Sequence, residues 1–404
     1  MTVGSSKRTL LLGVGGLAAA LLLACSGDGE DRPTVDVIND GGSGSASVSV
    51  SASGTGSGSV SASGITGGAG AQAGAGLLIP AGLAPETSGP SASDGIFTPE
   101  TNREIYQKIS SDYQEIAALT NVVNEGQPLP APEILLVYEA GMHTRIGTAS
   151  RPLRGFAREY TRITDFPEYV EFYESPTFLD TTVLDAIAGA RTAENYTDAQ
   201  RRQAIQKGIV RILYHWSLRY IRNAEETLNE GWVDEGWAIY MGEPGDDGSY
   251  PNSLSALARS REGNFGREGT IDTPMREAMV RAQAAAKADD DAAYQEAAND
   301  IYSRFNAIFY LATIRYLNEA VKSVEAGEMD SADVQMVEGL SFYYSIQQQV
   351  ATADPAVDEA IVGFYTAEPA SLTPEMRDDV LEAINGIADD LLLAQSDVVT
   401  EFPE

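Results

Sequence analysis

The chain contains only two histidines, and each stands among residues that bind ions. The first lies in "VYEAGMHTRIG" (residues 137–147), which brings Tyr138, Glu139 and His143 close together in sequence. If this segment is helical, Glu139 and His143 are one turn apart and face the same side. Carboxylate and imidazole at this spacing can share a metal ion, and phenolate is a typical ferric ligand. The alternative is a hydrogen-bonded core histidine without a ligand role.

The second histidine lies in "YHWSLRYIRNA" (residues 214–224). On a helix, His215 shares one face with Arg211, Arg219, Arg222 and Glu226. Three guanidiniums beside an imidazole could hold an anion, or a metal ion bound together with an anion. Alternatively, the arginines pair with some of the many carboxylates and keep the helix surface soluble. Both interpretations remain open at this point.

The segment around His215 occurs twice. "YLATIRYLNEA" (residues 310–320) repeats it with identical Tyr, Arg, Tyr and Ala at matching positions, and "EGWAIYM" (235–241) is matched by "EGLSFYY" (338–344). The repeat spans about 198–242 and 291–346 and indicates a duplicated helix pair. The Arg and Glu found in both copies are predicted to form equivalent ion pairs, Arg219–Glu235 and Arg315–Glu338. The imidazole belongs to the first copy alone.

Apolar residues recur at helical spacing along most of the chain, whereas alternating strand patterns are scarce. The predicted fold class is therefore all-α. The first helix is expected to begin at Thr98-Pro99, which reads as an N-cap followed by proline. Residues 134–137, "ILLV", could instead form a short strand. The other helices are predicted over residues 134–146, 178–189, 198–229, 275–288, 291–324, 331–349, 355–365 and 374–394.

The N-terminal residues predict export and an anchor. Residues 1–25 combine Lys7 and Arg8 with an apolar run and end in "LLAC", the order of a bacterial lipobox. Cys25 is the only cysteine, so it is the expected lipidation site, and it excludes disulfides within the chain. Residues 26–96 are rich in Gly, Ser and Ala and read as a disordered tether. Residues 97–404 form the predicted helical domain, anchored to the outer membrane and facing the periplasm or the cell surface.

The net charge of −32 argues against nucleic acid as a partner, because binding to phosphates needs clustered Lys and Arg. The common enzyme motifs are missing from the sequence, which has no nucleophile elbow, P-loop or dinucleotide fingerprint. The prediction is a protein that is not an enzyme. Two alternatives stay open: an extracytoplasmic hydrolase that uses paired carboxylates, and a structural surface lipoprotein.

Several segments resemble a known family. "YHWSLRYI", "EGWAIYMGE", "SLSALARSREGNFG" and "FYLATIRYL" are similar to the Fe-assimilating, low-iron-inducible periplasmic proteins of algae, which are related to the phytotransferrins. The resemblance covers about residues 100–370. It implies extracytoplasmic iron acquisition, with ferric ion (Fe3+) bound together with carbonate. It also implies a downstream iron transporter as partner.

Together, these observations predict one cleft that contains both histidines. The predicted metal ligands are His143, His215, Tyr138, Glu139, Tyr214 and Glu235. Arg219 or Arg222 would hold the bridging anion, because a guanidinium beside a bare cation is repelled, whereas carbonate between them accepts a bidentate hydrogen bond.

Overall fold

The helical periodicity of the sequence is realised in the fold. In the computed structural model, which describes residues 94–101, 103–146, 149–159 and 162–402, 71% of the described residues are helical. The all-α prediction is confirmed. The predicted signal sequence with Cys25, and nearly all of the predicted tether, lie outside the described residues. None of the helices described is both long enough and apolar enough to cross a bilayer.

The helices follow one another with short connections. A two-residue antiparallel ladder, β1 (Arg145–Ile146) with β2 (Ala149–Ser150), separates α3 from α4. The helices are α1 (Glu104–Gln107), α2 (Ile109–Asn121), α3 (Ala131–Ala140), α4 (Leu153–Ala157), α5 (Arg162–Asp165), α6 (Pro167–Tyr173), α7 (Phe178–Ala188), α8 (Asp198–Thr227), α9 (Glu230–Met241), α10 (Leu254–Asn264), α11 (Asp272–Lys287), α12 (Asp291–Glu325), α13 (Met329–Tyr343), α14 (Gln347–Ala353), α15 (Pro355–Tyr365) and α16 (Pro374–Gly386). Three short 3-10 turns, η1 (Val122–Glu125), η2 (Arg191–Ala193) and η3 (Pro369–Ser371), complete the described part.

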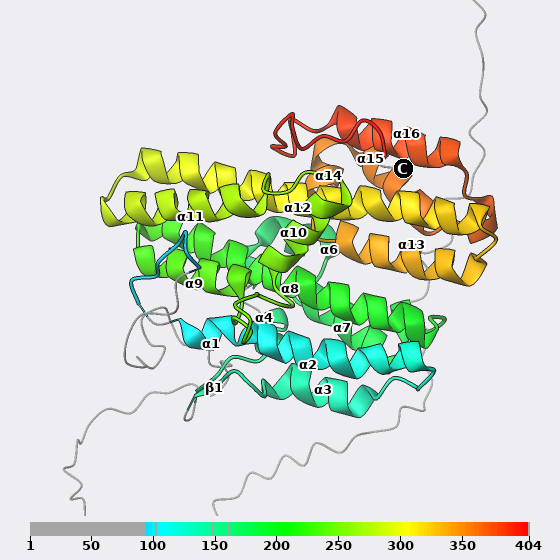
Figure 1. Ribbon diagram of the computed structural model, residues 1–404, viewed down its shortest axis with the longest axis horizontal. Helices are drawn as coiled ribbons and strands as arrows, with labels where there is room; N and C mark the ends of the chain where they lie inside the picture. The colour runs from blue at the N-terminus through cyan, green and yellow to red at the C-terminus, as the bar shows by residue number, and fades with distance from the viewer. Residues whose placement is uncertain (1–93, 102, 147–148, 160–161, 403–404) are drawn as a thin grey trace, which may run out of the picture. The chain divides into compact units, whose positions relative to one another are not determined.

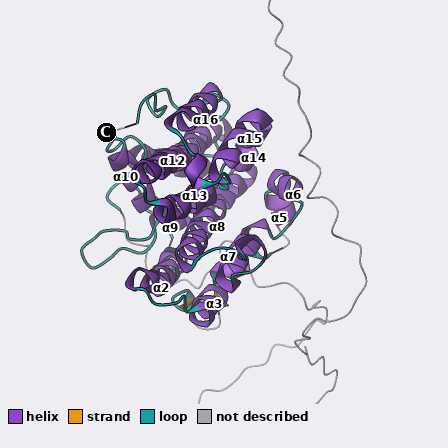
Figure 2. Ribbon diagram, turned by 90° about the vertical axis from the view of Figure 1, so that its right-hand side faces the viewer, coloured by secondary structure: helices purple, strands orange, loops and turns teal. Residues whose placement is uncertain are grey.

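Two long helices, α8 and α12, form the centre of the fold (Figure 1). α8 packs against α9 and α13, while α12 packs against α13 and α11. Helices α1 to α3 cover the α8 side, and α15 and α16 lie on the α12 side (Figure 1). Figure 2 shows the short helices α5 and α6 beside α7 and α14. Both central helices begin at a side-chain cap, Thr197 for α8 and Asp290 for α12.

The duplicated segments form the same kind of unit, a long helix followed by a shorter one. The extra residues of the second copy fall mainly within the helices, at the end of α12 and the start of α13, and the loop between them grows by one residue. At Gly236 of α9 a Cβ would meet Ile221 and the Ser217 carbonyl of α8 at 3.1 and 3.3 Å. A Cβ at the matching Gly339 would overlap the ring of Tyr365. The glycine of both copies therefore permits close packing.

The ion pairs predicted within each copy, Arg219–Glu235 and Arg315–Glu338, are wrong. Arg219 Nε lies 3.1 Å from Asp165 Oδ2, and Glu235 lies 3.7 Å from Arg103 Nε. In the second copy, Arg315 donates to Asn264 at 2.9 Å. Glu338 pairs with Lys207 of α8 at 2.9 Å and accepts a hydrogen bond from the Tyr316 hydroxyl at 2.5 Å. Side chains from outside each helix pair, both acidic or amide groups and cations, take the positions that were predicted to be filled within the pair.

Helix boundaries differ from the prediction where side chains or glycines intervene. Residues 98–101 do not start a helix, because the Asp234 carboxylate of α9 accepts the backbone N–H groups of Glu100 and Thr101 at 2.9 and 3.2 Å. The "ILLV" segment is helical rather than a strand, and α3 ends at Gly141, where φ is +65°. The predicted helix 331–349 ends at Tyr343, and a turn separates it from α14. The last helix ends at Gly386, eight residues before the predicted position 394.

Candidate functional site

His215 is enclosed by aromatic rings. It is fully buried on α8, and its Nδ1 lies 2.9 Å from the Arg211 carbonyl one turn earlier. The rings of Phe166, Tyr169 and Phe178 meet it edge to face, with centroids 4.8 to 5.4 Å away. These contacts are ring edges and faces, which hold the imidazole by packing. His215 therefore packs as a core residue of the first repeat copy.

His143 lies in different surroundings. Its side chain is 45% exposed, and Nε2 is 2.8 Å from Glu115 of α2. Its backbone N–H donates to Asp112, also of α2, at 2.7 Å. The exposed His143 and the buried His215 thus contact different helices, and the structure does not bring them to one cleft. Among the residues that the structure describes, no group of three or more His, Cys, Asp or Glu is arranged to hold a metal ion.

The other predicted ligands have separate partners. The buried Tyr138 donates its hydroxyl to Asp180 of α7 at 3.0 Å, and Glu139 pairs with Arg154 of α4. The buried Tyr214 hydroxyl accepts from Gln349 of α14 at 3.1 Å. Burial raises the pKa of Tyr138 and of Tyr214, and contact with another acidic group raises each further, so both stay protonated. The two phenols therefore act as structural hydrogen-bonding groups.

The two arginines predicted to bind an anion are both paired. Arg219 meets Asp165 at 3.1 Å, and Arg222 meets Glu168 at 2.7 Å. Arg222 also lies over the Phe166 ring, 5.0 Å from its centroid. These carboxylates come from α5 and from the start of α6. The interpretation that the arginines neutralise nearby carboxylates therefore holds for these two.

Glu235 lies in a buried polar cluster with Tyr106, Tyr220, Arg103 and Arg151. Arg151 donates to the Tyr106 hydroxyl at 2.9 Å, and the two tyrosine hydroxyls are 3.4 Å apart. Burial raises the pKa of Glu235 to about 7, although the two arginines and the two hydroxyls act to lower it. The cluster combines two phenols, one carboxyl and two guanidiniums without access to solvent.

The third arginine of the predicted face, Arg211, differs from the other two. It is 3% exposed, and its Nε and Nη2 atoms have no hydrogen-bond partner within the part of the chain that the structure describes. No carboxylate of that part lies within ion-pair distance of it. Its guanidinium packs on the rings of Tyr173, Phe178 and Tyr344 at 4.6, 5.0 and 5.7 Å from their centroids. A buried guanidinium without a counter-ion is rare, because burying a charge is costly unless it is paired.

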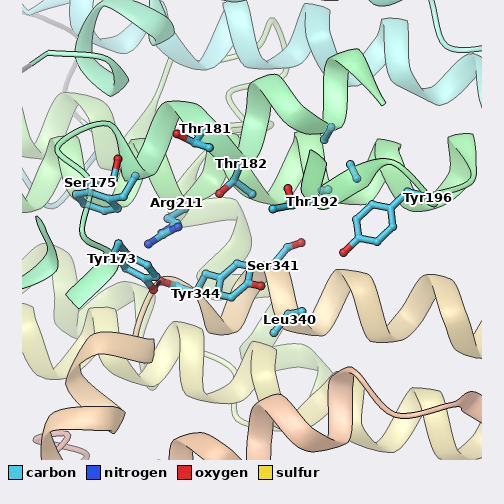
Figure 3. Close-up of a pocket in the computed structure, with 14 residues that line it drawn as sticks. Tyr173, Ser175, Thr181, Thr182, Thr192, Tyr196, Arg211, Leu340, Ser341 and Tyr344 are labelled. Carbon is cyan, nitrogen blue, oxygen red and sulfur yellow. Dashed lines mark hydrogen bonds between the residues drawn. The ribbon is translucent and has the colours of Figure 1, made fainter. Parts of the chain in front are cut away.

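Arg211 lines a cavity of about 270 Å³ between α7, η2, α8 and α13, here called the Arg211 cavity (Figure 3). Hydroxyl groups make up much of its polar wall, from Ser175, Thr181, Thr182, Thr192 and Ser341. The apolar wall comes from Phe178, Ala186, Ala193, Ala204 and Leu340. Figure 3 shows Arg211 beside Tyr173 and Tyr344, with Thr192 and Tyr196 at the other end of the labelled wall.

The local sequence explains how the cavity is built. Gly208 lies one turn before Arg211, and a Cβ there would meet Val183 of α7 at 2.7 Å, so glycine lets α7 approach α8 closely. Earlier in the chain, α7 ends at Gly189, whose φ is +61°. The 3-10 turn η2 follows and closes one side of the cavity. There Thr192 donates to the buried Asp185 at 2.9 Å, while Arg191 pairs with the same carboxylate at 2.5 Å. The carboxylate of Asp185 behind this wall is therefore already neutralised.

The charge of the cavity is positive in an acidic protein. Arg211 is the single charged residue among the described residues that line it. Burial raises the pKa of Tyr344 to about 12 and that of Tyr173 further, although Arg211 acts to lower both. Both phenols therefore stay neutral at physiological pH. The cavity offers one cation, which suits an anionic guest.

The sequence places Arg211 on the helix face that carries His215, but the predicted anion-binding residues were its neighbours Arg219 and Arg222. The repeat separates Arg211 and Arg222, which match the uncharged Ala307 and Asn318, from Arg219, which matches Arg315, but it does not separate Arg211 from Arg222. The hydroxyl residues of α7 and η2 gave no comparable signal.

Comparison with known proteins identifies no relative: the chain matches no family model, no curated protein and no solved structure.

Proposed function

We propose that this domain is a binding protein that holds a small anionic molecule in the Arg211 cavity. One observation carries the proposal: Arg211 is buried, faces the cavity and pairs with no carboxylate of the described residues, in a chain with 59 Asp and Glu. Elsewhere in the same helix, Arg219 and Arg222 have carboxylate partners. A bound anion would provide the missing counter-charge.

The physical chemistry supports binding rather than catalysis. A guanidinium presents donors in a fixed fork that matches a carboxylate or phosphate, and charge-assisted hydrogen bonds are about twice as strong as neutral ones. Arg211 is already ordered between three rings, so little side-chain entropy is lost on binding. The residues of the cavity wall include no imidazole or carboxylate that could move a proton.

Anion binding is tested by thermal unfolding of the protein with and without small anions. A bound ligand raises the unfolding temperature with concentration, because it binds the folded state alone. We expect this shift in the natural protein and its loss in Arg211→Gln. Arg222→Gln removes a guanidinium from the same helix outside the cavity and should retain the shift. A shift that persists in Arg211→Gln would overturn the proposal.

A second candidate function is ferric ion binding, which the resemblance to iron-assimilating proteins implies. The cluster of Tyr106, Tyr220 and Glu235 favours it, because two phenols and a carboxyl are suitable ligands for a hard ferric ion. Arg103 and Arg151 could hold carbonate beside the metal. We place the metal at this cluster and not at the two histidines. Carbonate would make the arginines favourable neighbours of the metal.

Ferric binding is tested by titration with Fe3+ in the presence and absence of bicarbonate. A phenolate complex gives a visible charge-transfer band, which Tyr220→Phe should weaken and Tyr138→Phe should leave unchanged. Absence of the band in the natural protein would reject this candidate.

Both candidates agree with a protein held at a membrane by its N-terminus. We propose that Cys25 is acylated, that the protein faces the periplasm or the cell surface of a bacterial outer membrane, and that it passes its ligand to a transporter. Cys25→Ser should release the protein from the membrane fraction into the soluble fraction. Retention of the variant in the membrane would exclude acylation as the anchor.

A further inference from the structure

The composition of the Arg211 cavity also defines the class of its ligand, an inference that rests on the anion-binding function proposed above. A single guanidinium balances a single negative charge. A phosphate dianion or a tricarboxylate would bring one or two further charges into a cavity whose described lining has no second cation. The net charge of −32 adds a repulsive background that grows with the charge of the ligand. The cavity therefore favours a monoanion.

The hydroxyl groups of the cavity wall restrict the class of ligand further. Thr181 donates to the Thr177 carbonyl at 3.1 Å, Thr192 to Asp185 at 2.9 Å, and Ser341 to the Val337 carbonyl at 2.7 Å. These protons are already used, so the three oxygens are left as acceptors. They suit a neutral or hydrogen-bond-donating part of the ligand rather than additional anionic oxygens.

The rest of the wall is apolar. Ala186, Ala193 and Ala204 are small and buried, and Leu340 closes the opposite side. The volume of about 270 Å³ lies near the lower end of the range for ligand pockets, roughly 300–1,000 Å³. A compact hydrophobic body would displace water from these side chains, with its charged end at Arg211.

The aromatic rings determine how the charged end binds. Tyr173, Phe178 and Tyr344 pack on Arg211 and cover its Nε and Nη2 atoms, while the guanidinium as a whole lines the cavity. A carboxylate in the cavity would gain a charge-assisted hydrogen bond from this guanidinium, which is stronger than a bond between neutral groups. We propose that the ligand is a monocarboxylic acid with a compact apolar body, and that an aromatic acid is the best fit.

The experiment compares four probes by isothermal titration with the full-length protein: benzoate, acetate, inorganic phosphate and citrate. Benzoate combines one carboxylate with an apolar ring, while acetate has the carboxylate alone. We expect benzoate to bind most tightly. Arg211→Gln should weaken benzoate binding by about tenfold to a hundredfold, as loss of a charge-assisted hydrogen bond predicts. Arg222→Gln is the matched control and should bind as the natural protein does.

A second variant tests the apolar body separately from the charge. Ala204→Leu adds volume at the buried apolar wall and should weaken benzoate more than acetate, provided that circular dichroism shows the variant to be folded. If that variant does not fold, the comparison of benzoate with acetate on the natural protein tests the same point. Equal affinity for the two would contradict the role of an apolar body.

These measurements distinguish a wrong ligand class from a wrong binding function. If phosphate or citrate binds more tightly than benzoate and requires Arg211, the assignment of a monocarboxylate is wrong, while the anion-binding function stands. If no probe binds in a manner that depends on Arg211, both are overturned.

Discussion

The single residue Arg211 lowers the stability of the ligand-free fold, because its charge is buried. Among the described residues its guanidinium has no ion-pair partner, and burying such a charge raises the free energy of the folded state by several kcal/mol, of which packing on three rings recovers part. The anion proposed above would offset this cost in the bound state.

We therefore predict that Arg211→Gln makes the ligand-free protein more stable, by about 1–2 kcal/mol. The amide fits the site without carrying charge. Urea unfolding followed by circular dichroism measures the difference, with Arg222→Gln as control, because that arginine has a carboxylate partner. A loss of stability in Arg211→Gln would mean that the ring contacts outweigh the desolvation of the charge.

Glu235 gives a pH-dependent prediction. Its pKa is raised from 4.5 to about 7 by burial, so between these values the folded state keeps a proton that the unfolded state has lost. Below pH 4.5 Glu235 does not lower the free energy of unfolding. As pH rises from 4.5 to about 7, the free energy of unfolding falls, and above pH 7 it is lower by the full amount, roughly 3 kcal/mol.

Glu235→Gln removes the ionisation and keeps the shape. The variant should match the natural protein near pH 4.5 and exceed its unfolding free energy at pH 8. Unfolding curves measured across this range test the prediction. A difference between the two proteins that does not change with pH would show that Glu235 ionises normally in the folded state.

Individual residues also mark the limit of what the sequence could predict about the site. It identified the face of α8 that carries Arg211, because helical spacing alone determines a face. It could not choose among the arginines, since Asp165 and Glu168, which neutralise the other two, lie about fifty residues earlier in sequence. Pairing depends on tertiary packing, which periodicity does not encode.

At the scale of helices, the repeat is explained by packing rather than by chemistry. The Glu-Gly sequence shared by α9 and α13 places a glycine where the adjacent helix or side chain approaches most closely. The carboxylate before it lies by a tyrosine in both copies, Tyr220 for Glu235 and Tyr316 for Glu338. The Glu-Gly pair and the neighbouring tyrosine therefore give both copies the same local packing.

Gly339 provides the test of this packing. A methyl group there would overlap the ring of Tyr365, which is 4% exposed and donates its hydroxyl to the Thr313 carbonyl at 2.5 Å. Gly339→Ala should therefore lower the free energy of unfolding by about 1–3 kcal/mol. Gly363 of α15 has no neighbour within 4 Å of a Cβ, so Gly363→Ala should be neutral or stabilising by up to about 1 kcal/mol. Equal effects of the two substitutions would contradict the packing argument.

Long helices were predicted well, and short ones were not. The boundaries of α8 and α12 agree with the predicted ranges within two residues, because their periodicity extends over many turns. Helices α4 to α6 have four to seven residues each, too few for a periodic signal, and they were missed. These short helices supply the carboxylates that pair with Arg219 and Arg222, so the same gap explains the error in the site.

At the scale of the whole molecule, the acidity of the chain opposes the ligand that its cavity attracts. A net charge of −32 repels every anion at long range, while Arg211 attracts it at contact. The two effects differ in range, and salt separates them. Interactions across more than a Debye length are screened, whereas a buried pair is screened much less.

Salt should therefore strengthen anion binding in this protein. Raising the ionic strength from about 0.01 M to about 0.15 M shortens the Debye length from roughly 30 Å to about 8 Å, which removes most of the repulsion by distant carboxylates. The buried contact at Arg211 is largely protected from the same screening. We expect the affinity for benzoate to rise by about twofold or more over this range. Titration calorimetry in buffers of increasing sodium chloride measures it, with the neutral benzamide as a control whose affinity should change little. An affinity for benzoate that falls with salt would show that the guest binds at an exposed basic surface and not in the buried cavity.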